Sequence, residues 1–452
     1  MKHLQRKYSP KTFLAFCLLV AGWQPAIAQV RQKARTPSTA DQPNPIAKRV
    51  REINSLGESK NPGALAEIRR ALSSSQWYER GAAALAFARI AQRDAVPDLA
   101  PLLDDENWFV RDSAIEALVV AGDPAAAIPI ERLLQSPDPF TRARAATALS
   151  RLNTPTAATA LVKLLQDGSS QVRRAAASAL GELKIPSAAD NLIALLKDEQ
   201  PAVRAAAAVS LGRIGDKRAA ASVEAEFEKA GDDAWRYAAA LCRLGKPEYL
   251  NRLTPALKSP YRETRAEAFA SLMDLADPRS LPDLVEALHG ASPDQSGSAE
   301  AISLRVAFAR GLVRFEGTEA RDALIALTAD PEPAVRASAV ASLAARARFA
   351  GPADPASIKT VVGLLKREQS PVVIEAVMAA LPSFDKDKLT DSLLGAIDGD
   401  AKGTARIREG LKAVDVTPEK LASSLKAGDP STQIAALEKL ERLRDPGTAQ
   451  AL

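Results

Sequence analysis

Small and large apolar residues recur along this chain with a period of 31 residues. The period is marked by arginines at this interval, namely Arg49, Arg80, Arg111, Arg142, Arg173 and Arg204. From Arg80 onwards, the positions three and six residues after each of these arginines are small, and the seventh is large and apolar. Offsets of three, six and seven lie on one face of an α-helix. The pattern therefore predicts one amphipathic helix in each period.

A second, shorter helix is predicted before each arginine. It begins after turn signals such as Gly122-Asp123-Pro124 and ends in paired leucines such as Leu102-Leu103. A proline three residues before the arginine, as at Pro139, suits the first turn of the following helix, since its missing N–H needs no partner there. Each period is thus a helix–turn–helix unit that is too small to bury its own apolar face. We expect stacked units that share one core.

Polar residues also keep fixed places in the period. An aspartate stands six residues before several arginines, and a motif close to Ala-x-x-Ala-Leu follows them. The stretch DEQPAVRAAAAVSLGRIGD, residues 198–216, resembles the HEAT-like repeat first named in phycobilin lyase proteins. The resemblance implies an all-α fold, a right-handed α-solenoid of about a dozen helix–turn–helix repeats. It also implies a hydrogen-bonded ladder between adjacent repeats, with members Asp105, Arg111, Asp167, Arg173, Asp198, Arg204, Asp330 and Arg336.

Several repeats depart from the aspartate of this motif. Ser74, Ser136 and Ser259 replace it, and Glu368 replaces it once. We expect the ladder to be interrupted at these four positions.

The period itself breaks at two places. The step from Arg265 to Arg305 is longer than the period, and the excess matches the stretch 290–298, which is rich in Gly, Ser and Pro. A second insertion lies near residues 347–357. We expect loops at both places within a solenoid that spans residues 46–452. Residues 29–45, QVRQKARTPSTADQPNP, lack apolar content and predict a disordered leader before it.

The N-terminal segment, residues 1–28, is typical of a secretory signal peptide. It has a basic start, an apolar run at residues 12–22, and small residues two apart in Ala26-Ile27-Ala28. The apolar run is short for a bilayer span, which favours cleavage after Ala28 over a membrane anchor. The sequence therefore predicts a periplasmic or secreted protein without a membrane span after cleavage.

Charge and reactive residues narrow the possible functions further. The formal net charge is +5, but the predicted signal peptide holds four basic and no acidic residues, so the rest of the chain is close to neutral. We therefore expect no nucleic-acid partner. Beyond Ala28 the chain has one cysteine, Cys242, and one histidine, His289. This excludes a Cys/His zinc site and leaves no Ser–His or Cys–His arrangement, so we expect no metal, no cofactor and no catalytic residue.

Five aromatic residues share the 31-residue step. Trp77 and Trp108 are one period apart, and so are Tyr78, Phe109 and Phe140 in succession. Aromatic residues are only 4% of the chain, so this register suggests an edge that grips a partner. The alternative interpretation, which we favour, is that the five rings seal the hydrophobic core near the N-terminal end.

These observations lead to three functional hypotheses. The first is a non-catalytic protein–protein interaction scaffold or adaptor in the bacterial cell envelope or secreted, because solenoid surfaces bind extended protein or peptide partners. The second, implied by the resemblance, is a lyase-like enzyme or enzyme accessory that uses the solenoid to hold a substrate. The third is a structural subunit of an envelope complex.

Overall fold

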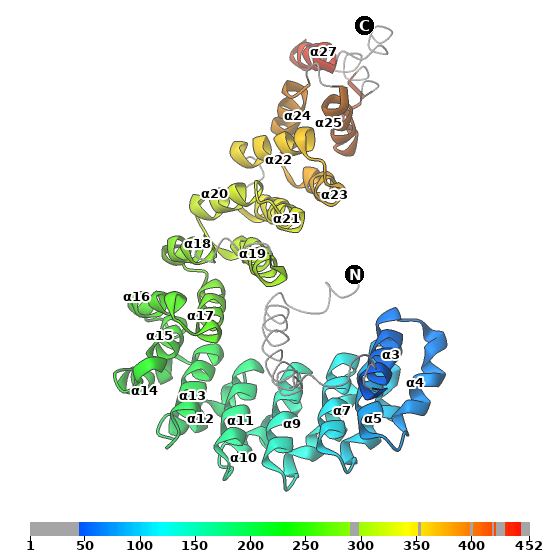
Figure 1. Cartoon of the computed structure of the whole chain (residues 1–452). Helices are drawn as coiled ribbons and strands as arrows, with labels where there is room; N and C mark the ends of the chain where they lie inside the picture. The colour runs from blue at the N-terminus through cyan, green and yellow to red at the C-terminus, as the bar shows by residue number, and fades with distance from the viewer. Residues whose placement is uncertain are drawn as a thin grey trace, which may run out of the picture. The chain divides into compact units, whose positions relative to one another are not determined.

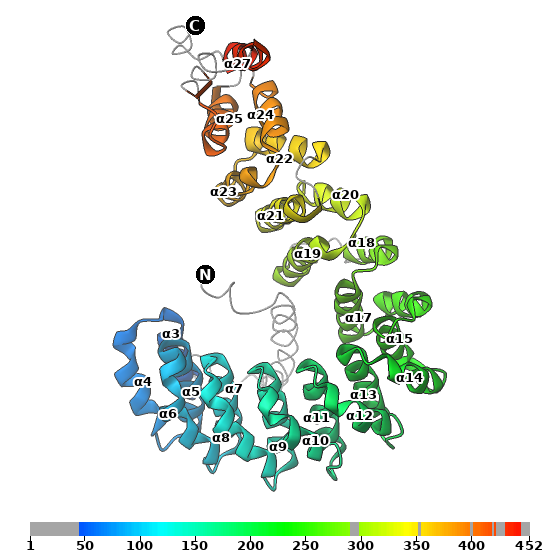
Figure 2. The same cartoon turned by 180° about the vertical axis from the view of Figure 1, so that it is seen from behind.

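The computed structural model describes residues 45–289, 298–350, 354–397, 401–417, 420–421 and 430–443. The predicted signal peptide, the leader up to residue 44, residues 290–297 and residues 351–353 lie outside these ranges. All regular structure within them is helical (Figures 1 and 2), which confirms the predicted all-α fold. The described residues divide into two compact units, residues 45–255 (the N-terminal unit) and residues 256–443 (the C-terminal unit).

Two layers of helices build the N-terminal unit. The first layer consists of the arginine-bearing helices, or anchor helices: α3 (Pro45–Ser59), α5 (Trp77–Ala91), α7 (Trp108–Ala121), α9 (Pro139–Arg151), α11 (Ser170–Glu182), α13 (Pro201–Ile214) and α15 (Ala234–Arg243). The second layer consists of the shorter helices: α4 (Leu65–Leu72), α6 (Val96–Leu99), α8 (Ala127–Arg132), α10 (Ala158–Leu164), α12 (Ala189–Leu195), α14 (Ala220–Phe227) and α16 (Leu250–Leu253). Consecutive anchor helices pack on one another, and they lie on the inner side of this curved unit (Figures 1 and 2).

Short 3₁₀ turns lead into or out of the second-layer helices. Proline stands at the start of many of them, where its fixed φ and missing N–H are compatible with helix initiation. At the predicted turn, Gly122 ends α7 with a φ of 68°, and the Asp123 side chain accepts a 2.9 Å hydrogen bond from the Ala125 N–H. The turns of this unit are η1 (Pro62–Ala64), η2 (Gln92–Ala95), η3 (Ala100–Asp104), η4 (Pro124–Ala126), η5 (Leu133–Gln135), η6 (Pro155–Ala157), η7 (Pro186–Ala188), η8 (Lys217–Ala219), η9 (Gly231–Asp233) and η10 (Pro247–Tyr249), with η11 (Thr254–Lys258) following.

The C-terminal unit repeats the helix–turn–helix arrangement with longer second-layer helices. Its helices are α17 (Arg262–Leu275), α18 (Leu281–His289), α19 (Ala299–Gly311), α20 (Thr318–Leu327), α21 (Pro333–Ala350), α22 (Pro355–Arg367), α23 (Pro371–Ala380), α24 (Lys386–Gly395), α25 (Ala401–Ala413) and α27 (Pro430–Leu443). Its 3₁₀ turns are η12 (Pro278–Ser280), η14 (Leu312–Arg314) and η15 (Leu381–Ser383).

The core of the N-terminal unit lies between its two layers. From Arg80 to Arg204, the large residues seven positions after the arginines are fully buried, and the paired leucines that end the second-layer helices are buried as well. They include Phe87, Leu118, Leu149, Leu180 and Leu211 from the first layer, and Leu103, Leu134 and Leu196 from the second. The predicted periodicity therefore gives the core correctly, because each layer buries its apolar face only against the other.

Glycines allow three pairs of anchor helices to approach closely. Each of these glycines lies eight residues after an arginine of the period. A Cβ atom at Gly57 would come within 2.7 Å of the Ala86 Cα, and one at Gly181 within 2.6 Å of the Ser210 Cα. Gly212 faces Ala240 in the same way, at 2.7 Å. Backbone atoms cannot move aside as side chains do, so these positions tolerate no larger residue.

Candidate functional site

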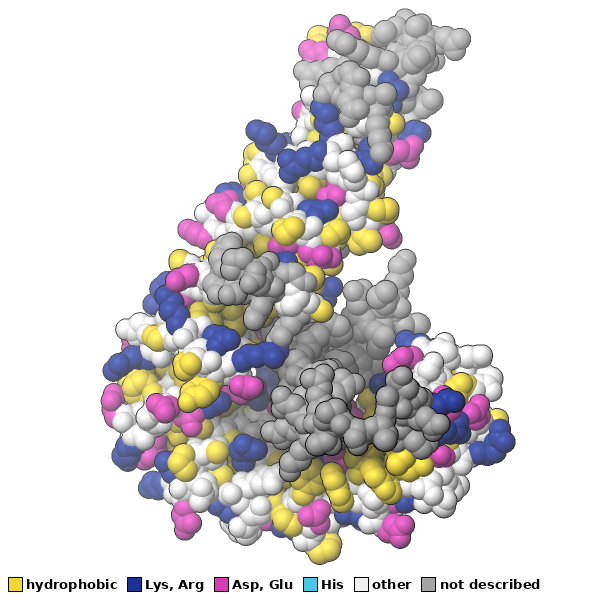
Figure 3. Space-filling view, in the orientation of Figure 1, with side chains coloured by type: hydrophobic (Ala, Val, Ile, Leu, Met, Phe, Trp, Pro, Cys, Tyr) yellow, Lys and Arg dark blue, Asp and Glu magenta, His cyan; other side chains and the backbone are white. Residues whose placement is uncertain are grey.

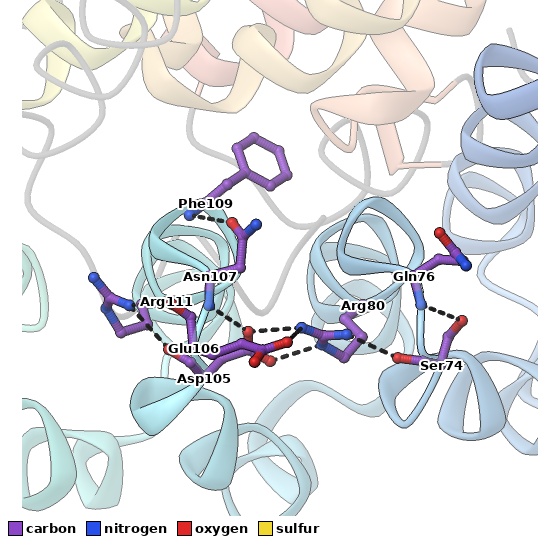
Figure 4. Close-up of polar contacts among 8 residues, drawn as sticks. All are labelled: Ser74, Gln76, Arg80, Asp105, Glu106, Asn107, Phe109 and Arg111. Atoms are coloured by element: carbon purple, nitrogen blue, oxygen red, sulfur yellow. Dashed lines mark hydrogen bonds and ion pairs between the residues drawn. The ribbon is translucent and has the colours of Figure 1, made fainter.

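A ladder of arginines and carboxylates links the starts of consecutive anchor helices. Arg80 donates from Nε and Nη2 to the two oxygens of Asp105, at 2.7 and 2.8 Å, while its Nη1 donates to the Ser74 carbonyl at 2.9 Å (Figure 4). Asp105 also accepts the Asn107 N–H at 2.9 Å. One guanidinium thus joins the carbonyl end of its own second-layer helix to the turn before the next anchor helix.

The same bidentate arrangement recurs in both units. Each ladder carboxylate lies in the repeat that follows the repeat of its partner arginine. Asp105 thus accepts from Arg80 of the preceding repeat. Arg111, which is in the same repeat as Asp105, donates only to the Asp105 and Glu106 backbone carbonyls. The remaining pairs are Arg142–Asp167, Arg173–Asp198, Arg305–Asp330 and Arg336–Glu368.

Two of the ladder carboxylates, Asp105 and Glu368, are held in their charged form. Burial alone would raise the pKa of Asp105, but the Arg80 guanidinium and the Asn107 N–H together hold it below its ordinary value. For Glu368 the hydrogen bond from Arg336 is the largest influence and lowers the pKa to about 2, with the Ser370 and Gln369 N–H groups contributing. Bonding of the ionised carboxylate therefore outweighs its desolvation.

The expected interruption at Glu368 is wrong. Its longer side chain reaches Arg336 with two hydrogen bonds of 2.8 and 2.9 Å, so the bidentate pair is preserved. At Ser136, no carboxylate of the described residues bonds to Arg111. Arg204, one of the expected members, donates to the Asp198 and Glu199 backbone carbonyls at 2.9 and 3.1 Å and forms no ion pair with any carboxylate that the structure describes.

The five periodic aromatic residues form one continuous row, which we call the aromatic strip: Trp77, Tyr78, Trp108, Phe109 and Phe140. Ring centroids are 5.8 Å apart for Trp77–Tyr78, 5.4 Å for Trp77–Phe109, 6.0 Å for Trp108–Phe109 and 6.3 Å for Trp108–Phe140. All four pairs are edge-to-face, with interplanar angles from 78° to 89°. Such pairs stabilise each other by about 0.5–1.5 kcal/mol beyond area burial.

The interpretation of these rings as a seal for the core is wrong for three of them. Trp108 is 60% exposed, Trp77 is 46% exposed and Phe109 is 38% exposed, whereas Tyr78 and Phe140 are half-buried. The rings lie in the first turns of α5, α7 and α9, at the edge of the first layer, where the second layer does not cover them. Figure 3 shows hydrophobic side chains gathered at the surface of this part of the N-terminal unit. Their role in partner binding stays a prediction.

The strip is positioned by local capping and by the ladder. Asn107 caps α7 by accepting the Phe109 N–H at 2.9 Å, and Asp138 caps α9 by accepting the Phe140 N–H at 3.2 Å. Gly81 leaves room for the Phe109 ring, since a Cβ atom at position 81 would lie 2.6 Å from that ring. Phe109 extends from the same helix end as the ladder but away from Asp105 (Figure 4). The ladder therefore fixes the register of α5 and α7, whereas within the described ranges no ladder pair joins α7 to α9, because Ser136 replaces the carboxylate.

A second charged network, which the sequence did not reveal, joins anchor helices further along their length. Arg144 of α9 bonds to Asp112 of α7, and Arg151 reaches both Glu116 oxygens at 2.6 and 2.8 Å. Burial is the largest influence on both carboxyls: it raises the pKa of Asp112, whereas the two arginines still hold the pKa of Glu116 below its ordinary value. The spacing of Asp112 and Glu116 by one helical turn was the available signal.

Reactive residues do not gather into a catalytic arrangement in the described part of the chain. Cys242 is a partly buried residue of α15 that forms no disulfide, and His289 is the last residue of α18. Among the described residues, no group of three or more His, Cys, Asp or Glu side chains is placed to hold a metal ion.

Comparison with known families agrees with this architecture. A family model described as HEAT repeats matches residues 38–119, 110–177, 159–241, 228–303 and 296–382. The chain belongs to the HEAT repeat family. No curated protein matches the sequence of this HEAT repeat protein.

Several solved structures are similar to this HEAT repeat protein. The complex of CpcE and CpcF of phycocyanin lyase from Nostoc sp. PCC7120 is 21% identical, with a TM-score of 0.31, over 48% of this chain and 96% of that one. Human deoxyhypusine hydroxylase is 19% identical, with a TM-score of 0.27, over 65% and 97%. Kap121p bound to Ste12p is 13% identical, with a TM-score of 0.47, over 88% of this chain but 54% of that one. At these values, no activity or partner transfers to this chain.

Proposed function

We propose that this HEAT repeat protein is a non-catalytic scaffold that binds a protein or peptide through the aromatic strip. The observation that carries the proposal is the exposure of Trp77, Trp108 and Phe109 side by side on two neighbouring repeats. A folded protein gains nothing by leaving a connected row of large rings in water. Connected apolar surface of this kind marks interaction sites in soluble proteins.

The composition of the strip also suits binding. Tryptophan and tyrosine dominate the energetics of protein interfaces, because they bury much area and lose little side-chain entropy. The edge-to-face contacts and the helix caps already hold the rings in place, which reduces the ordering cost when a partner binds. A rigid edge that crosses three repeats fits an extended segment better than a compact domain.

The proposal is tested by truncating the strip. We expect the double variant Trp77→Ala/Trp108→Ala to remain folded, since the two residues are 46% and 60% exposed and lie outside the core between the layers. It should lose partners that co-purify with the native protein. Ile128→Ala is the matched control, because Ile128 is 78% exposed but lies on α8 in the second layer. Proteins captured equally by the native chain, the control and the double variant would overturn the proposal. So would unfolding of the double variant.

We further propose that the chain is exported to the periplasm or the medium. The support is the basic start, the apolar run and the Ala26-Ile27-Ala28 motif of the predicted signal peptide. Among the helices in the described ranges, none is long and apolar enough for a membrane span. N-terminal sequencing of protein from fractionated cells should begin at Gln29. Recovery from the cytosol with residues 1–28 intact would reject export but leave the binding proposal standing.

A further inference from the structure

The anchor-helix register places the entry of the chain at one end of the aromatic strip. Pro45 begins α3, and Ile46 stands three residues before Arg49, as Trp77 stands three before Arg80 and Trp108 three before Arg111. Ile46 is 45% exposed, so it extends the exposed apolar row by one repeat. Because α3 packs directly on α5, the first residue of α3, Pro45, lies at the same end of the layer as Trp77, the first residue of α5.

The length of this preceding segment matches the strip. Residues 29–44 are sixteen residues, and an extended or polyproline II segment covers about 3.1 Å per residue. The row from Ile46 to Phe140 crosses four anchor helices, or roughly 30 Å at 8–10 Å between neighbouring axes. Some ten residues of the preceding segment are therefore long enough to reach from Ile46 to Phe140. The Pro43-Asn44-Pro45 sequence is a turn signal that allows the chain to reverse direction over the row.

The chemistry of the segment also complements the strip. It contains Pro37 and Pro43, whose rings pack on aromatic side chains in polyproline II recognition. Three of its residues, Arg31, Lys33 and Arg35, are basic, and Asp41 alone is acidic. Arginines of this chain already lie over aromatic faces elsewhere, as Arg236 does over Trp235 at 4.5 Å.

An exposed acidic group borders the strip and favours a basic occupant. The Glu106 side chain, two residues before Trp108, is 90% exposed, and Arg80 Nη2 lies 3.7 Å from its Oε1. Glu79, next to Tyr78, is only 20% exposed and pairs with Arg49 at 3.7 Å. Asp138 already accepts the Phe140 and Thr141 N–H groups. An occupant with positive charge and proline rings therefore meets the Glu106 carboxylate and aromatic faces together.

We propose that residues 29–44 of the same chain occupy the aromatic strip as an extended segment, which a partner must displace. This inference uses the strip of the proposed function but does not require that a partner exists. Attachment at Pro45 gives the segment a millimolar effective concentration, so contacts that are individually weak suffice. The segment thus acts as a built-in competitor for the binding edge.

The exposure of Trp77 and Trp108 to acrylamide quenching tests the inference in the chain that begins at Gln29, the proposed mature N-terminus. Trp23 is then absent and the remaining Trp235 is buried, so the fluorescence change reports the strip. The leader variant carries Arg31→Ser, Lys33→Ser, Arg35→Ser, Pro37→Ser and Pro43→Ser. The matched control carries Ala34→Ser and Thr39→Ser.

We expect the leader variant to raise the quenching constant about twofold, because loss of the tethered occupant exposes both rings. The control variant should behave as the native chain. Adding a peptide of residues 29–44 to the leader variant should restore protection. Equal quenching in native and leader-variant proteins would overturn the inference. Protection that disappears on dilution would also overturn it, since the occupant would then be the leader of a second copy.

Failure here is separable from failure of the proposed function. If the leader does not protect the rings but Trp77→Ala/Trp108→Ala abolishes partner capture, the binding function stands and only the competitor is rejected. If the leader protects the rings but partner capture is unchanged by the double variant, the strip serves the leader alone.

Discussion

Two adjacent aspartates allow a direct measurement of what the ladder contributes to stability. Asp104 and Asp105 each form an ion pair with an arginine of another repeat, and both pairs have an N–O distance of 2.7 Å. They differ in solvent exposure. In the Asp104–Arg132 pair the side chains are 65% and 63% exposed, whereas in the Asp105–Arg80 pair they are 8% and 11% exposed.

The structure sets the expected magnitudes. Asp105→Asn removes the charge that accepts two hydrogen bonds from Arg80 and one from the Asn107 N–H. Removing one partner of a buried pair costs about 3–5 kcal/mol. Arg80 keeps its bond to the Ser74 carbonyl and a little solvent contact, so we expect about 2–3 kcal/mol. Asp104→Asn breaks a pair in water and should cost about 0–1 kcal/mol.

Hydrogen exchange of the native state is the suitable assay. Repeat proteins open locally between neighbouring repeats, so a single midpoint of thermal unfolding would average over units that lose stability separately. The free energy of opening at amides of α5 and α7 should fall in Asp105→Asn and stay nearly unchanged in Asp104→Asn. Amides of α11 and α13 serve as internal controls in both variants.

One outcome would refute this reasoning. If the two variants lowered the opening free energy of α5 and α7 by the same amount, within about 0.5 kcal/mol, burial would not be what makes the ladder matter. A loss spread evenly over α5 to α13 would refute the local character of the ladder.

Three further predictions concern other parts of the scaffold. The pKa of Glu368 is lowered from 4.5 to about 2 in the folded protein. The Arg336–Glu368 pair therefore stabilises the folded state fully above pH 4.5, by about 3 kcal/mol, and this contribution is lost as the pH falls towards 2. Acid unfolding of the C-terminal unit should show this loss, and Glu368→Gln should flatten the pH dependence. Ser136→Asp supplies the missing carboxylate to Arg111 and should stabilise the packing of α7 on α9 by up to about 1 kcal/mol in hydrogen exchange, less the repulsion from Asp138. The control Ser136→Asn should give no such gain. A loss of stability in Ser136→Asp would contradict the idea that Arg111 lacks a carboxylate partner. Gly181→Ala places a Cβ 2.6 Å from the Ser210 Cα and should lower the free energy of chemical unfolding by about 1–3 kcal/mol. The control Gly168→Ala should be nearly neutral, because no atom lies within 4 Å of the added Cβ. Equal effects of the two variants would reject close packing as the reason for Gly181.

The sequence alone determined the repeat and its core. A 31-residue period with small residues at two offsets and a large apolar residue at a third describes one helix face, because side-chain direction in a helix follows from spacing. The burial of Leu118 and Leu149 followed from that periodicity. The ladder residue types were also visible, since aspartate and arginine recur at fixed offsets.

Only the tertiary structure decided how these residues combine. Asp105 bonds to Arg80 of the preceding repeat, 25 residues away, and not to the Arg111 side chain six residues on, because packing of α5 on α7 sets that distance. The close approach at Gly181 likewise depends on a neighbouring backbone. Exposure of Trp77 and Trp108 was misjudged because periodicity places a ring on a helix face but does not say whether the second layer covers that helix end. Local sequence thus fixed the helices and their faces, and contacts between repeats fixed which faces remain exposed.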